Sequence, residues 1–142
     1  MEEGRFQHPE GRLSGAERWA LPGLLALSFI SHAYNLFQYP PYLGDEGIYM
    51  EQAWAVLRQG KLSPYTYFYD HAPAGWLLIA WWTLLLPAKF STFGMAINAV
   101  RVLMLVLHVA SSAMLFSVAR RWGGTTAAAI AVLVFSLSPL SI

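Results

Sequence analysis

The sequence has 142 residues, of which 56% are hydrophobic, 15% are aromatic and only 12% are charged. The charged share is roughly half that of a typical soluble domain, so the composition indicates a membrane protein. No cysteine is present and the formal net charge is +1. Disulfides and thiolate metal sites are therefore excluded, and the charge gives no case for nucleic-acid binding.

The first two segments differ sharply in polarity. Residues 1–18 mix arginines and glutamates with glycine and proline, so we expect a disordered cytoplasmic arm. Residues 19–38 are mostly apolar, and their length nearly spans a hydrocarbon core of ~30 Å. We predict a transmembrane helix there, with its N-terminus inside because Arg18 abuts its start. A cleaved signal peptide is the alternative, but its charged region would be long and no A-x-A site follows Ile30.

A polar and aromatic loop follows this segment and holds half of the acidic residues of the chain. It reads YPPYLGDEGIYMEQAWAVLRQGKLSPYTYFYDHAPAG over residues 39–75. Its acids are Asp45, Glu46, Glu51 and Asp70, and no acid follows Asp70. Any carboxylate chemistry must therefore come from this loop or from the N-terminal arm, and we favour the loop.

Within the loop, residues 46–59 have the periodicity of an amphipathic helix that Gly60 closes. Asp45 is a natural N-cap, and the free N–H groups of the first turn stabilise negative charge on Asp45 and Glu46. Capping alone would explain both acids, so a catalytic role stays one of two readings. We expect the helix to lie on an apolar surface. Its apolar side is predicted to carry Tyr49, Met50, Ala53, Trp54, Val56 and Leu57, and its water-facing side Glu51, Gln52, Arg58 and Gln59.

The next apolar segment, 74–87, is too short for a conventional crossing. Thirteen residues lie between Pro73 and Pro87, which gives about 20 Å of helix against the ~30 Å needed to cross. Three tryptophans within it favour the membrane interface over the lipid centre. We therefore predict a second interfacial helix here, although a crossing helix is the alternative.

Two further transmembrane helices are predicted at 95–119 and 125–142. In the non-crossing arrangement Arg120 and Arg121 are inside, as paired arginines at a helix end prefer. The chain stops directly after an apolar run. We therefore expect residues 19–142 to form the N-terminal part of the transmembrane module of a longer protein. His32 and Asn35 are expected to be solvated at the outer interface. His108 is expected to be a packed, neutral histidine.

Several motifs in this order resemble the membrane-embedded, lipid-carrier-dependent glycosyltransferases. This family includes the protein O-mannosyltransferases and the transferase that adds aminoarabinose to lipid A. The resemblance covers about residues 20–140. It rests on the first transmembrane helix, the Asp45-Glu46 pair followed by Tyr49, the run 67–73 (YFYDHAP) leading into Gly75-Trp76, and Phe93-Gly94 followed by 99–102 (AVRV).

The resemblance implies an all-α, polytopic integral membrane protein of the GT-C type, with two interfacial helices in its first outer loop. It implies transfer of a sugar from a polyprenyl-phosphate donor to an acceptor hydroxyl at the outer face of the cell membrane. The chain departs from many relatives in having Ala72 before Pro73 where they have two prolines. It also ends before the later outer loops that complete the site in the family.

Such a reaction makes unequal demands on donor and acceptor. The leaving phosphate is already a stable anion, whereas the acceptor hydroxyl benefits from a base worth about 10²–10⁴ in rate. Asp45 resembles the base proposed in the family, and Glu46 is its catalytic partner in our assignment. We assign donor binding to Tyr49, Tyr69, Asp70, His71 and Arg101.

Two of the donor-binding assignments have simpler alternatives. Arg101 could extend its guanidinium to the outer headgroups, and Asp70 could merely cap the segment that follows it. A divalent cation could be held by Glu46 and Asp70, because hard cations take carboxylate oxygens. For the chain as a whole, the alternative to an enzyme is a non-enzymatic polytopic protein, such as a transporter or a polysaccharide-assembly subunit.

Overall fold

The computed structural model describes residues 15–42, 44–63 and 73–138, and no strand occurs within these ranges. The predicted all-α class is confirmed for this part of the chain. Tyr69, Asp70 and His71, all of them predicted site residues, lie outside the described residues. The elements in chain order are α1 (Gly15–Ala33), α2 (Gly44–Gln59), α3 (Ala74–Leu85), the short 3-10 helix η1 (Lys89–Ser91) and α4 (Ala96–Leu137).

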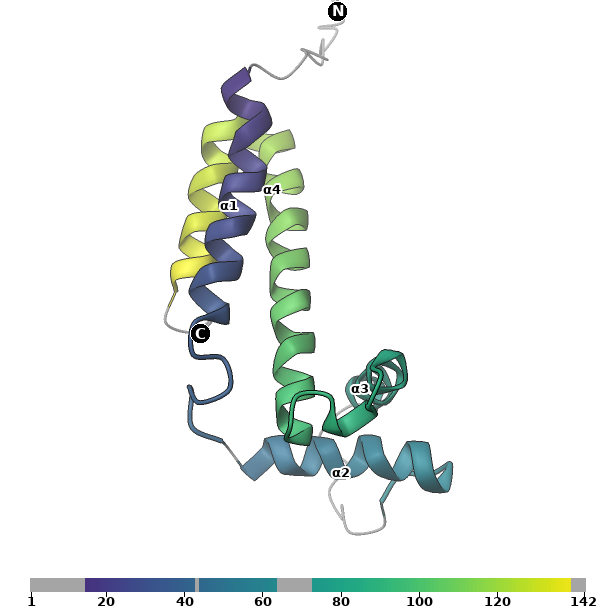
Figure 1. Cartoon of the computed structure of the whole chain (residues 1–142). Coiled ribbons are helices and arrows are strands. Elements are labelled where there is room, and N and C mark those ends of the chain that lie inside the picture. Colours follow the sequence, from purple (N-terminus) through teal and green to yellow (C-terminus); the bar gives the residue numbers. More distant parts are fainter. Residues whose placement is uncertain (1–14, 43, 64–72, 139–142) are drawn as a thin grey trace, which may run out of the picture.

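The long element α4 is a helical hairpin, because Gly124 interrupts it with non-helical backbone angles (φ 75°, ψ −176°). Its two arms, 96–123 and 125–137, run antiparallel (Figure 1). A Cβ atom on Gly123 would lie 2.6 Å from the Cβ atom of Ala127, so both glycines are needed for this tight turn. The predicted break at 119–125 is therefore confirmed, but the first arm continues through Arg120 and Arg121 to the turn.

Helix α1 packs against the hairpin and completes a three-helix bundle (Figure 1). Near the glycine turn, Leu21 and Leu24 pack against a buried cluster that includes Phe116. Further along, the hydroxyls of Ser28 and Ser112 lie 3.1 Å apart. Since residue numbers rise along α1 as they fall along the first arm, the two are antiparallel. The start of α1 and the glycine turn therefore lie at the same end of the bundle.

Helix α1 ends earlier than the predicted segment 19–38. The chain leaves the helix after Ala33, and Asn35 has a left-handed backbone (φ 56°). The carbonyl of Asn35 then accepts bonds from the N–H groups of Gln38 and Tyr39, both at 2.9 Å. Asparagine tolerates this conformation better than most residues, so a tight turn replaces the last helical turn that hydropathy predicted.

Helices α2 and α3 lie across the other end of the bundle, where α2 runs transverse to α4 (Figure 1). A buried cluster joins the three helices and contains Met50 and Ala53 of α2, Ile79 and Ala80 of α3, and Leu103 of α4. Burial of such side chains contributes about 1.5–3 kcal/mol for each large one. Helices occur where the two interfacial helices were predicted, at Gly44–Gln59 and Ala74–Leu85, and their position at a membrane interface stays a prediction.

The C-terminal end of α2 agrees with the sequence pattern, and its two faces agree except at two residues. Gly60 adopts a left-handed conformation (φ 67°) and its N–H bonds Val56 O at 3.1 Å, as a helix-closing glycine does. Gln52, predicted to face water, is fully buried, because its Oε1 atom accepts a bond from the Ser63 N–H at 2.9 Å. Trp54, predicted on the packed side, is 45% exposed.

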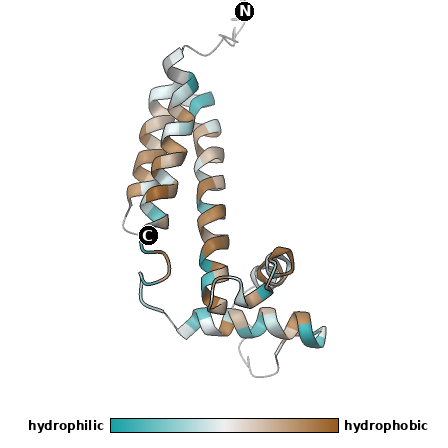
Figure 2. Ribbon diagram, in the orientation of Figure 1, coloured by the Kyte–Doolittle hydropathy of each residue, from teal (hydrophilic) through white to brown (hydrophobic). Residues whose placement is uncertain are grey.

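Among the described helices, α4 alone is long and apolar enough to cross a membrane; α1 does not meet the same criterion. Only 22% of the most apolar window of α4 is buried in the protein, whereas a core helix of a soluble protein would be mostly covered. Figure 2 shows hydrophobic residues along much of the bundle and α3, and an alternation along α2. Exposed apolar side chains of this surface include Ile30, Met104, Met114, Val118, Ile130 and Val134.

Candidate functional site

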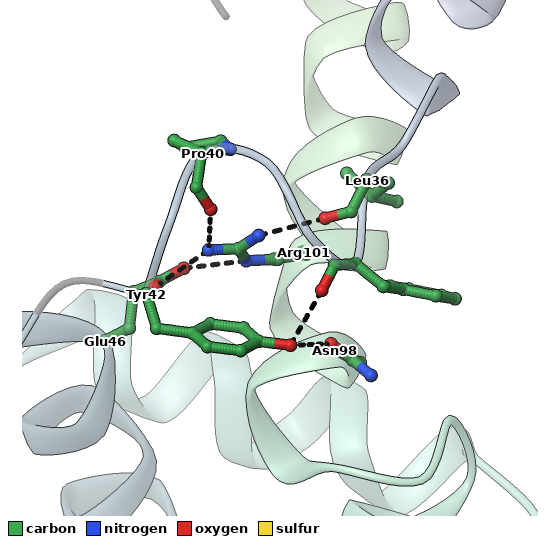
Figure 3. Close-up of polar contacts among 7 residues, drawn as sticks. Leu36, Pro40, Tyr42, Glu46, Asn98 and Arg101 are labelled. Carbon is green, nitrogen blue, oxygen red and sulfur yellow. Dashed lines mark hydrogen bonds and ion pairs between the residues drawn. The ribbon is translucent and has the colours of Figure 1, made fainter.

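Arg101 is the centre of the most extensive polar contact in the described chain. It lies near the start of α4 and is only 6% exposed. Its Nε atom donates to Glu46 Oε1 and its Nη2 atom donates to Glu46 Oε2, both at 3.0 Å (Figure 3). This parallel pair of bonds is the strongest geometry that a guanidinium and a carboxylate form. It ties the first turn of α2 to the bundle.

The same guanidinium also holds the turn that follows α1. Nη1 donates to Leu36 O at 3.0 Å, and Nη2 donates to Pro40 O at 2.8 Å. Four of the five N–H groups of Arg101 are therefore engaged. Leu36 belongs to the predicted segment 19–38 and lies beyond the end of α1, and Pro40 belongs to the loop that follows. One side chain from α4 therefore fixes both the α1–α2 turn and the start of α2.

Tyr42 covers the guanidinium, with the Cζ atom of Arg101 4.5 Å from the ring centroid. The Tyr42 hydroxyl lies 2.7 Å from Phe37 O and 3.2 Å from Asn98 Oδ1 (Figure 3). A cation held against an aromatic face gains about 0.5–2 kcal/mol, depending on how far it is desolvated. We call this unit the Arg101 clasp and define it as Arg101, Glu46, Tyr42 and the backbone carbonyls of Leu36 and Pro40.

The two neighbouring carboxylates of α2 have opposite surroundings. The Glu46 side chain is 26% exposed and bound by Arg101. Asp45 is exposed and makes no hydrogen bond or ion pair with the described residues. Because α2 begins at Gly44, Asp45 lies within the first turn rather than at the predicted N-cap. The helix end still favours its negative charge, and its carboxylate is open to an incoming group.

The remaining predicted site residues are not gathered around Asp45 in the described chain. Tyr49 is half-buried and packs against the cluster between α2, α3 and α4. Arg101, assigned to donor phosphate, is bound to Glu46 instead. The described residues contain no group of three metal-ligand side chains, and both Glu46 oxygens already contact a cation.

A second polar cluster lies inside the bundle, and the sequence pattern did not reveal it. The rings of His32 and His108 stack with their centroids 3.7 Å apart, and the ring of Phe135 also stacks on His108, with the centroids 4.8 Å apart. Solvation at the outer interface was predicted for His32, but the structure packs its ring against His108. His108 is packed, as predicted. We define the histidine layer as Ser28, His32, His108, Ser112, Phe135 and Ser136.

The histidine layer is only partly hydrogen-bonded. Ser28 and Ser112 pair through their hydroxyls, and His32 Nδ1 lies 3.0 Å from Ser28 O. In the described chain, His108 Nε2 and Ser136 Oγ are buried without a hydrogen-bond partner. A buried polar atom without a partner costs about 1–3 kcal/mol. The histidine layer therefore contrasts with the Arg101 clasp, where both hydrogen bonds between Arg101 and Glu46 are formed.

No protein-family model matches the chain, and no curated protein and no solved structure is found to be similar to it. The resemblance to lipid-carrier-dependent glycosyltransferases therefore stays a prediction from the residues.

Proposed function

We propose that the chain forms the N-terminal part of a polytopic membrane glycosyltransferase of the GT-C type. The enzyme transfers a sugar from a polyprenyl-phosphate donor to an acceptor hydroxyl at the outer face of the cell membrane. One observation carries the proposal: two adjacent carboxylates at the start of α2 differ in their contacts and exposure. Glu46 is fixed by Arg101, and Asp45 beside it is exposed.

In this proposal Asp45 is the base that takes the proton of the acceptor hydroxyl as it attacks the sugar. An exposed carboxylate at a helix N-terminus can meet a hydroxyl, and its position is set by the helix that carries it. The Arg101 clasp supports this role by fixing the first turn of α2. In this proposal Arg101 is therefore a positioning residue. A divalent metal ion bound by Glu46 would have to displace the Arg101 guanidinium.

The charge of the donor phosphate needs other partners. His71, with Tyr69 and Asp70, remains the candidate for this role, because it follows α2 in the same outer loop of the sequence. A cation or hydrogen-bond donor there would stabilise the leaving phosphate in a site of low dielectric.

The arrangement of helices supports a topology with α2 and α3 at the outer surface. Arg120 and Arg121 lie close to the glycine turn, and Arg18 lies near the start of α1, so the three lie at the same end of the bundle. Cytoplasmic ends of transmembrane helices are enriched in such cations. Helix α3 has 12 residues, about 18 Å, which is short of the ~30 Å of a hydrocarbon core.

This topology has a direct test in a chain without cysteine. We expect an impermeant maleimide to label Lys89→Cys in intact cells and to leave Trp122→Cys unlabelled until the membrane is opened. Trp122 is 90% exposed and lies beside the glycine turn, so lack of labelling reports the membrane side and not burial. The reverse pattern, or labelling of both sites, would contradict the proposed topology.

The enzymatic claim is tested by Asp45→Asn in the full-length protein. The exposed side chain keeps its shape, so we expect normal insertion, while turnover falls by about 10² or more, or at least ~2.7 kcal/mol of transition-state stabilisation. Glu46→Gln, at the neighbouring residue, is the comparison variant. It should lower both thermal stability and turnover, because it weakens the Arg101 clasp. Near-normal turnover in Asp45→Asn would overturn the role of Asp45 as base.

A further inference from the structure

A cavity of about 360 Å³ lies where α2, α3 and η1 meet. Its size is within the range of small-molecule sites in proteins. Its lining includes the polar residues Arg58, Lys89 and Ser91 and the apolar residues Trp54, Leu57 and Phe90. The cavity therefore offers positive charge and hydrophobic surface to the same occupant.

Both cations are available to a ligand. Arg58 and Lys89 are exposed, and neither has a carboxylate partner among the described residues. Lys89 has a left-handed backbone (φ 50°), and its carbonyl accepts a bond from Thr92 Oγ1 at 2.8 Å. The same Thr92 oxygen accepts a bond from the Ala88 N–H at 3.2 Å. The short turn that presents Lys89 is therefore held by its own hydrogen bonds.

The cavity is separate from the candidate base. Arg58 is 13 residues along α2 from Asp45, which corresponds to about 20 Å of helix. The cavity instead adjoins the surface of α3, whose outward side chains are apolar. The exposed side chains of that surface are Leu77, Leu78, Trp81, Leu84 and Leu85.

We propose that this cavity binds the phosphate headgroup of an anionic phospholipid. Arg58 and Lys89 neutralise the phosphate, the Ser91 hydroxyl donates to it, and an acyl chain continues along the apolar wall. A free phosphate ion would use the cations but not the apolar wall, whereas the cationic headgroup of a zwitterionic lipid would bring a further positive charge beside Arg58 and Lys89. The inference rests on the proposed placement of α2 and α3 at the membrane surface, and it is independent of glycosyl transfer.

The test is a titration of the purified full chain in zwitterionic micelles, followed by amide chemical shifts at residues 54–58 and 88–91. We expect saturable shifts with dihexanoyl phosphatidylglycerol, and much weaker binding of dihexanoyl phosphatidylcholine and inorganic phosphate. The double variant Arg58→Gln/Lys89→Gln should bind phosphatidylglycerol about 30-fold more weakly. Each cation near a membrane surface raises the affinity for an anionic lipid about fivefold, and the two effects multiply. Arg58→Lys should bind nearly as the parent does.

The matched control is Arg120→Gln/Arg121→Gln, which removes the same charge at the opposite end of the bundle and should leave the affinity unchanged. An equal loss in this control would show that total charge, and not the cavity, attracts the lipid and would overturn the proposal. Equal affinity for phosphatidylcholine, or for inorganic phosphate, would overturn it as well. None of these readouts involves turnover, so failure here leaves the role of Asp45 untouched, and failure of Asp45→Asn leaves this site untouched.

Discussion

The Arg101 clasp and the histidine layer are both polar clusters packed between helices, yet they are satisfied to different degrees. In the clasp, one guanidinium makes four hydrogen bonds to a carboxylate and two carbonyls. In the histidine layer, His108 Nε2 and Ser136 Oγ are buried without partners in the described chain. The clasp lies where α2 joins the bundle, and the layer lies within the bundle itself.

This difference indicates different roles in the architecture. A network in which nearly every donor is bound specifies one geometry, because any rearrangement breaks several bonds at once. In the histidine layer some buried polar atoms form no hydrogen bond, so ring stacking and apolar packing hold the helices together there. We therefore expect the clasp to fix the start of α2, and with it Asp45, while the histidine layer tolerates change.

The largest loss is expected from Glu46→Leu. The substitution leaves the buried Arg101 guanidinium without its carboxylate, and removing one partner of a buried pair costs about 3–5 kcal/mol. The 26% exposure of the Glu46 side chain places the expected loss at the lower end of that range. Thermal unfolding in detergent micelles measures it, with the exposed neighbour change Asp45→Asn as the control. Equal stability of the two variants would contradict the anchoring role.

A smaller effect, about 1 kcal/mol, is expected from Tyr42→Phe. The ring stays over the guanidinium, but the hydroxyl contacts to Phe37 O and Asn98 Oδ1 are lost. The same unfolding measurement applies. A loss as large as that of Glu46→Leu would show that the hydroxyl, and not the ion pair, carries the clasp.

The smallest effect is expected from His108→Phe. The substitution keeps a flat ring between His32 and Phe135 and removes the buried Nε2 atom that has no partner. Replacing an unsatisfied polar group by an apolar one of similar shape is nearly neutral or stabilising. A loss of more than about 2 kcal/mol would mean that His108 has a polar role that the described residues do not account for.

Local patterns predicted the elements of this fold well because they depend on nearby residues. The periodicity of 46–59, the closing Gly60 and the short apolar segment after Pro73 each predicted an element that the structure contains. A break between the apolar runs 95–119 and 125–142 was predicted in the same way, although the first arm extends beyond residue 119. Gln52 was misplaced, because its burial depends on Ser63, which returns to α2 from the following loop.

The tertiary pairing at the candidate site could not be predicted from these patterns. Glu46 and Arg101 are 55 residues apart in sequence, and no local rule pairs them. Each had a reasonable alternative, a helix-dipole role for Glu46 and a headgroup contact for Arg101. The one available signal was that a cation early in an apolar helix needs an anion nearby, and Glu46 was one of the few acids in the outer loop.

The most direct test of the clasp is a pulsed electron paramagnetic resonance measurement between α2 and the bundle. The chain has no cysteine, so spin labels at Gln59→Cys and Met114→Cys report one distance. A second pair, Ile30→Cys with Met114→Cys, reports on the bundle alone. We predict a narrow distribution for both pairs in the parent, and in Arg101→Leu a broad distribution for the α2 pair with the bundle pair unchanged. A narrow, unshifted α2 distribution in Arg101→Leu would contradict the claim that the clasp fixes α2.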